Sequence, residues 1–173
     1  MIGAVTLVLA ILATTWSAVS PSTVGPSQAS VALFGLEVVA IDCRGRPAPV
    51  LKKHAVDSCA LRDLLRAGLQ AGPVKAIEPG VMGAYSPPTL GFEVSAQEGA
   101  ESGVVAFSVA LVLREPFVRQ LTGPIYRVWA ITWSTEYLGV VQEKDLADEV
   151  RRIAASFVSE FTREAREAPS AFR

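Results

Sequence analysis

The stretch between residues 104 and 161 constrains the fold of this 173-residue chain more than any other. A run of strand-forming residues, Val104–Arg114, is followed by a glycine- and proline-containing turn at Arg119–Pro124 and by a second such run, Ile125–Tyr137. An amphipathic helix is then predicted from about Glu143 to Glu167, because apolar residues recur there at helical spacing. We therefore expect two adjacent antiparallel strands with this helix packed on one of their faces.

The side chains of these two strands should alternate between two faces. In the first strand the larger side chains share one face, namely Val105, Phe107, Val109, Leu111 and Leu113. In the second strand the alternation assigns one face to Ile125, Arg127, Trp129, Ile131 and Trp133, and the other to Tyr126, Val128, Ala130, Thr132 and Ser134. Pro116 has no N–H to donate, so the pairing should break or bulge there. A loop through Gly139 should lead to the helix.

The N-terminal half contributes two further strands. Val31–Cys43 is apolar almost throughout and is typical of a strand that is buried on most of both faces. In Thr89–Ala96 the apolar residues alternate with polar ones, which predicts a half-buried strand with Leu90, Phe92 and Val94 on the inner face. Val74–Ile77 is a candidate for a short additional strand.

A helix is predicted between these strands. Asp57 or Ser58 should cap its start after a loop over Arg44–Val56, and its apolar residues Leu61, Leu64, Leu65 and Leu69 follow helical spacing. Gly68 could already end it, and Gly72-Pro73 must.

Long strands followed by a helix indicate an α+β two-layer sandwich. We expect a mostly antiparallel four-stranded sheet with two helices on one face, formed by a single domain over residues 31–168 and followed by a short tail at 169–173. A chain of this length has room for one such core.

The N-terminus predicts export. Residues 1–20 carry no charged side chain, and Ile2–Ala13 is apolar apart from Thr6, as in a signal peptide, although the usual positive residues are missing. The apolar run is shorter than the roughly 20 residues that span a bilayer comfortably. A retained anchor is the alternative, and membrane contact would then occur only through this segment. A flexible lead-in over 21–30 places the mature start near Ser30, in the periplasm or cell envelope.

The two cysteines, Cys43 and Cys59, should form a disulfide in an oxidising compartment. Cys43 ends the first predicted strand and Cys59 lies in the first turn of the returning helix, so the required approach is attainable. Two separately buried thiols are the alternative. Two cysteines and one distant histidine are too few for a closed zinc site, so we expect no metal.

Composition and motifs argue against several functional classes. Sixteen basic residues stand against seventeen acidic ones, which leaves no excess to neutralise phosphates and no support for nucleic-acid binding. Gly80-Val-Met-Gly lacks the Lys-Ser/Thr and the following helix of a phosphate-binding loop, and we expect no cofactor.

His54, Asp57 and Ser58 are the residue types of a hydrolytic triad. They lie too close together in one loop for the usual geometry, in which the three groups come from separate segments. We interpret Asp57 and Ser58 as helix caps. His54, beside two lysines, should be solvated rather than act as a pH sensor or metal ligand. We therefore expect no catalytic residues here.

Trp129, Trp133 and Tyr137 form the most distinctive series. At an even spacing on one strand, here four residues each time, such residues share a face and are most often core. The alternative is an exposed aromatic platform that binds a glycan, lipid or protein partner, and this makes the three residues our candidate partner face.

Several of these motifs resemble a group of short exported bacterial proteins of unknown function. The shared elements are Phe107-Ser-Val-Ala-Leu-Val-Leu-Arg, Thr132-Trp-Ser-Thr, Gly139-Val-Val, the closing helix, and Leu64-Leu-Arg-Ala-Gly at the end of the first helix. The charged segment Arg163–Arg166 departs from the aromatic and Asn-rich ending of that group. The resemblance implies no reaction. The topology is also similar to small envelope-assembly lipoproteins of the lipopolysaccharide-assembly type.

These observations predict a non-enzymatic domain of the cell envelope that binds or supports the assembly of an envelope protein, glycan or lipid. The alternative is a small envelope hydrolase whose site is assembled from loops. A deep pocket with convergent titratable groups would favour the hydrolase, and a shallow sheet face with apolar side chains would favour the binding domain.

Overall fold

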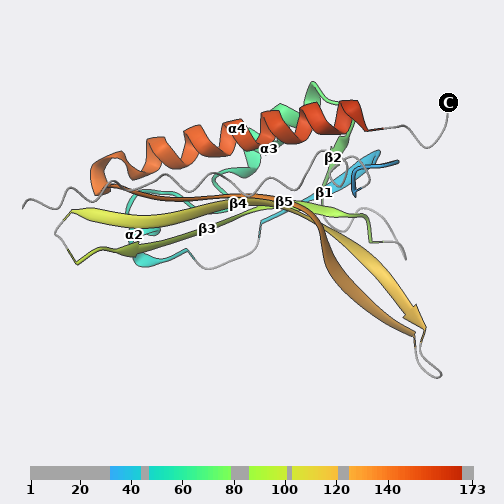
Figure 1. Cartoon of the computed structure of the whole chain (residues 1–173), viewed down its shortest axis with the longest axis horizontal. Helices are drawn as coiled ribbons and strands as arrows, with labels where there is room; N and C mark the ends of the chain where they lie inside the picture. Colours follow the sequence, from blue (N-terminus) through green and yellow to red (C-terminus); the bar gives the residue numbers. More distant parts are fainter. Residues whose placement is uncertain (1–31, 44–46, 79–85, 101–102, 121–124, 169–173) are drawn as a thin grey trace, which may run out of the picture.

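The computed structural model describes residues 32–43, 47–78, 86–100, 103–120 and 125–168 (Figure 1). The predicted signal peptide, the lead-in and the tail lie outside the described residues. The elements, in chain order, are β1 (Val38–Asp42), α2 (Pro49–Lys53), α3 (Arg62–Gln70), β2 (Lys75–Ile77), β3 (Thr89–Glu98), β4 (Val104–Gln120), β5 (Ile125–Gln142), the 3₁₀ turn η1 (Glu143–Asp145) and α4 (Leu146–Glu167).

The strands form one sheet in the order β2-β1-β3-β4-β5. β1 runs parallel to both β2 and β3, whereas β4 runs antiparallel to both β3 and β5. The predicted α+β class is therefore confirmed, but the described sheet is mixed and five-stranded, and three helices accompany it. The difference arises because the chain leaves β1 through α2 and α3 and returns as β2, and such a crossover makes two strands parallel.

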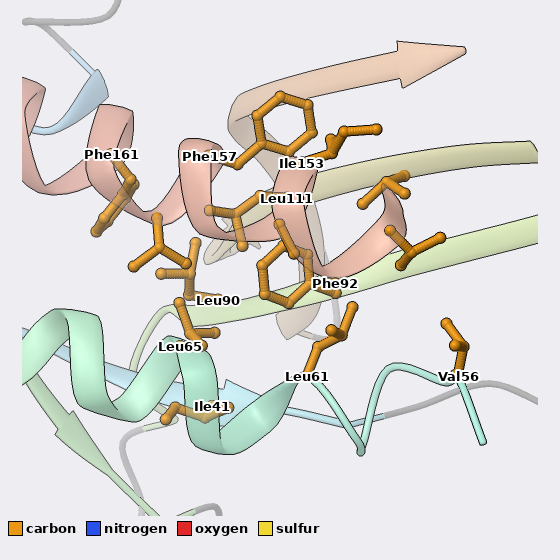
Figure 2. Close-up of a cluster of buried hydrophobic side chains, with 14 of the residues drawn as sticks. Ile41, Val56, Leu61, Leu65, Leu90, Phe92, Leu111, Ile153, Phe157 and Phe161 are labelled. Atoms are coloured by element: carbon orange, nitrogen blue, oxygen red, sulfur yellow. The ribbon is translucent and has the colours of Figure 1, made fainter. Parts of the chain in front are cut away.

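One face of the sheet carries the core. Leu90 and Phe92 of β3 stand opposite Leu113 and Leu111 of β4, and all four side chains are buried, as their alternation predicts. Helix α4 covers β4 and β5, and α3 lies beside it. Figure 2 shows how these side chains meet between the sheet and the helices. The buried helical residues are Leu61, Leu65 and Leu69 from α3 and its first turn, and Leu146, Val150, Ile153, Ala154, Phe157, Val158 and Phe161 from α4.

A bulge in β5 changes the alternation that the sequence predicts. The register passes from Leu113 opposite Trp133 to Arg114 opposite Ile131, which leaves Thr132 as an extra residue. Trp133 therefore points toward the helices, whereas Ile131 and Trp129 point to the other face. The prediction of a single face for Trp129, Ile131 and Trp133 was wrong. One inserted residue moves every side chain on its far side to the opposite face of the sheet.

The same hairpin differs from prediction at two other points. Pairing does not break at Pro116, which stands opposite Trp129 within the ladder, and the irregularity lies between Leu113 and Arg114 instead. Gly139 does not lie in a loop, since β5 continues to Gln142. A Cβ atom on Gly139 would lie 3.1 Å from the ring of Phe107, so the glycine makes room for that ring.

The connection between β1 and α3 was predicted as a loop and contains a short helix, α2. Pro49 begins this helix, where the missing N–H needs no partner, and Val50 and Leu51 are buried. The helix ends at Lys53, and Ala55, two residues further on, has a positive φ of 52°. The Val56 N–H then donates to the Leu51 carbonyl at 2.9 Å.

The boundaries of β1 and α3 also differ from prediction. The first strand begins only at Val38, after a turn in which the Leu36 N–H donates to the Leu33 carbonyl. Asp57 caps the turn before α3, accepting from the Ala60 N–H at 2.7 Å, and α3 itself begins at Arg62 and continues through Gly68. A Cβ atom on Gly68 would collide with Val158 at 2.1 Å, so this glycine allows close packing of α3 on α4.

Cys43 and Cys59 form the predicted disulfide, with a Cα–Cα distance of 4.9 Å. The bond ties the end of β1 to the turn that precedes α3. None of the helices in the described part of the chain is long and apolar enough to cross a membrane.

Candidate binding surface

The structure does not bring the three aromatic residues of the predicted partner face together. Trp133 is 5% exposed and behaves as a core residue, with its ring packed edge-on against Phe161 at a centroid distance of 5.1 Å. Its Nε1 donates to Glu164 Oε2 at 2.8 Å. Tyr137 lies on the same helix-facing side, half-exposed, 5.9 Å from the ring of Phe107. Trp129 lies beyond the bulge and faces the opposite way.

We call the side of β3, β4 and β5 that points away from α3 and α4 the outer face. Large apolar side chains of β5 are exposed on it: Leu138 is 70%, Ile131 60%, Val140 57% and Trp129 39% exposed. Such side chains are usually exposed singly on a soluble domain, and several on one strand are typical of an interaction surface. The sequence could not reveal this set, because regular alternation along β5 would place Trp129 and Ile131 on the same face as the buried Trp133.

A shallow cavity of about 220 Å³ opens on the outer face beside Trp129. It is lined by Asp42, Thr89, Gly91, Phe92, Glu93, Arg114 and Trp129. Arg114 and Glu93 form an ion pair across the two central strands. Gly91 has no side chain to fill the cavity, and a Cβ atom there would lie 2.8 Å from the Asp42 carbonyl oxygen of β1.

The groups in this cavity combine an aromatic wall with carboxylates and a guanidinium. An indole face packs against an apolar surface, while the charged groups accept or donate hydrogen bonds at its rim. This combination suits a ligand with both an apolar face and polar edges, such as a sugar ring or a peptide side chain.

Two further apolar side chains are exposed on the hairpin arm beyond the bulge, but they lie on the helix-facing side and not on the outer face. Figure 1 shows the C-terminal part of β4 and the N-terminal part of β5 bending together away from the body of the domain. Phe117 of β4 stands opposite Val128 of β5, and both are about half exposed on the side opposite Trp129. Burial raises the pKa of Glu115, the neighbour of Phe117.

Two carboxylates of α4 face the helix-side surface of β5. Glu164 accepts from Trp133, and Glu160 Oε2 accepts from Thr135 Oγ1 at 3.5 Å. Burial raises the pKa of Glu160, and the negative charge of Glu164 adds to this shift. These contacts fix the edge of α4 on β5.

The sequence predicts a solvated His54, but in the structure its side chain is 20% exposed and has a partner. Its Nε2 lies 3.1 Å from Glu143 Oε1, which also accepts from Lys53 Nζ at 2.6 Å. The hydrogen bonds from Lys53 and His54 lower the pKa of Glu143. The sequence could not indicate this cluster, because Glu143 lies 89 residues from His54. The cluster joins the end of α2 to the start of η1. Asp57 is not part of it, because its carboxylate accepts from the Ala60 N–H in the turn before α3.

A second groove, of about 540 Å³, lies on the helical side between α3 and α4. Gly68 and Val158 contribute to it, and Arg166 crosses its end by donating to the Ala71 carbonyl at 2.7 Å. Within the described ranges, no group of three or more His, Cys, Asp or Glu side chains is placed to hold a metal ion.

Comparisons of the chain with protein-family models, with curated proteins and with solved structures find no significant match.

Proposed function

We propose that this chain is an exported domain of the cell envelope with a non-catalytic binding or assembly-support role. The observation that carries the proposal is the exposed apolar set on the outer face of β5, next to the cavity walled by Trp129. A shallow sheet face of this kind is the arrangement expected of a binding domain rather than of a hydrolase. The uncharged apolar segment at the N-terminus and the disulfide support export.

The part of the outer face around Trp129 and Ile131 is the binding surface in this proposal. Partner classes that fit its chemistry are an envelope protein, a glycan or a lipid. An aromatic residue with an adjacent ion pair is well suited to provide most of the binding energy, since tryptophan and arginine dominate many interfaces.

A cross-linking experiment in intact cells tests the proposal. A photoreactive residue is placed at Ile131 of the full chain and, as a matched control, at Arg151, which is exposed on α4. We expect capture of an envelope component from position 131 and not from 151, and loss of that capture when Trp129 is changed to alanine. Fractionation of the same cells locates the chain.

Two outcomes would contradict the proposal. Equal capture from positions 131 and 151, or none from either, would show that the outer face near Trp129 is not a binding surface. Recovery of the chain with the cytoplasmic fraction would refute export, and intact full-length chain in carbonate-washed membranes would show that the N-terminal segment is an anchor.

A further inference from the structure

We propose that the outer edge of β5, with which no other strand of the described residues pairs, pairs with β5 of a second copy of this chain, antiparallel and about a two-fold axis at Gly139. This would join two sheets into one continuous ten-stranded sheet. The inference goes beyond the proposed function, because it concerns the edge of the sheet rather than the surface around Trp129.

The structure identifies which backbone groups form this edge. The Glu143 N–H donates to the Gly103 carbonyl at 2.7 Å, one residue beyond the pair formed by Val104 and Gln142. In an antiparallel ladder the hydrogen-bonded residues alternate. Counting back from Glu143, every second residue from Val141 to Trp133 therefore directs its N–H and carbonyl toward β4. The intervening residues, Ser134, Glu136, Leu138, Val140 and Gln142, direct theirs away from the sheet.

The two edges of the sheet differ in how they are protected. β2, at one edge, is three residues long and begins with Lys75, and short or lysine-bearing edge strands resist further pairing. β5, at the other edge, is 18 residues long. Its sequence contains no lysine and no proline, and its charged residues are Arg127 and Glu136. Among the described residues, a long edge with few charges and no proline is a template for another strand.

The sequence around Gly139 matches itself when it is reversed. An axis at Gly139 places Leu138 opposite Val140 of the second copy and Tyr137 opposite Val141. It also places Glu136 opposite Gln142, so apolar side chains meet apolar ones and polar meet polar. The two Glu136 carboxylates are then about 20 Å apart along the strands. An axis at Glu136 would instead set the two carboxylates side by side, which is destabilising.

The helices are compatible with this pairing. α4 contacts both β4 and β5 and follows the length of the hairpin's inner part (Figure 1). Strands in a sheet lie about 4.8 Å apart, so the two copies of α4 would lie about 10 Å apart, which is the normal distance for packed helices. Arg152 forms a two-bond ion pair with Glu149 on α4. A two-fold axis between these residues would bring Arg152 of one copy beside Glu149 of the other.

The test uses the full chain recovered from expressing cells, with its mass in solution measured over a wide concentration range. We expect a dimer. The double variant Leu138→Lys/Val140→Lys should raise the dissociation constant roughly tenfold or more, because lysines then face each other twice across the axis. Gln97→Lys, on the same face but two strands from the edge, is the matched control and should leave the constant unchanged. Circular dichroism shows whether each variant is folded.

A cross-linking variant tests the register. With the axis at Gly139, the two Leu138 positions are diagonal neighbours about 7–8 Å apart, so Leu138→Cys should be joined by a short bifunctional thiol reagent. Gln97→Cys should not. A chain that is monomeric throughout overturns the proposal, and so does a dimer that the two lysines do not weaken or that cross-links equally from position 97. Capture of a different polypeptide from position 138 overturns it in favour of a foreign strand. None of these results bears on capture at Ile131, so the two proposals fail separately.

Discussion

The buried indole of Trp133 should make an unusually large contribution to stability, and the exposed Trp129 a small one. Trp133→Phe removes the hydrogen bond to Glu164, whose side chain is 18% exposed. A hydrogen bond to a charged group contributes about 1.5–3 kcal/mol. The smaller ring also gives up about 1 kcal/mol of apolar burial. We therefore expect Trp133→Phe to lower the free energy of unfolding by about 2.5–4 kcal/mol, against about 0.5 kcal/mol or less for Trp129→Phe.

Urea unfolding followed by far-ultraviolet circular dichroism measures both effects without relying on tryptophan emission. The loss at Trp133 corresponds to a fall of about 1–2 M in the urea midpoint. A double-mutant cycle with Glu164→Gln isolates the hydrogen bond, and we expect a coupling of about 1 kcal/mol or more. If Trp133→Phe and Trp129→Phe had the same effect, the assignment of the two rings to opposite faces, and with it the bulge at Thr132, would be refuted.

Two further predictions concern the disulfide and a carboxylate of α4. The Cys43→Ser/Cys59→Ser variant should lose roughly 3 kcal/mol of unfolding free energy, because the bond closes a loop with a sequence separation of 16; an unchanged urea midpoint in the variant would contradict this. Glu160→Gln should stabilise the protein near neutral pH, since the raised pKa of Glu160 means that the folded state ionises it less readily than the unfolded state does. The contribution of Glu160 to the free energy of unfolding of the wild type falls as the pH rises above about 4.5, the ordinary pKa of glutamate. The advantage of the variant should therefore disappear near pH 3, where the carboxyl group is protonated in both states. An equal advantage at neutral pH and at pH 3 would count against the burial of Glu160.

The sequence predicted correctly those features that depend on the spacing of apolar residues within one strand or helix. The alternation in Leu90, Phe92 and Val94, and the heavy face that runs from Val105 to Leu113, gave the inner faces of β3 and β4. The apolar stripe of α4 was equally clear, since Phe157 and Phe161 recur at helical spacing and are buried. The disulfide followed from the succession of a strand end and a helix start.

Predictions failed where the deciding interaction is not local. The bulge at Thr132 has no signature in the alternation of Trp129, Ile131 and Trp133, because the residue pattern is the same with or without it. Helix α2 was missed because Pro49 was interpreted as a loop residue, although proline also begins helices, and because Ala55 occupies a positive-φ position where glycine is expected. The partnership of His54 with Glu143 depends on the tertiary fold alone.

The bulge at Thr132 also limits the registers in which the long hairpin can pair. Two smooth strands of this length could pair in several registers that differ by two residues, each with the same side chains facing inward. An inserted residue removes this freedom, because Thr132 must lie opposite the junction of Leu113 and Arg114 for both halves of the ladder to close. The bulge thereby fixes the alignment in the middle of the hairpin, beside the segment of β4 that also pairs with β3.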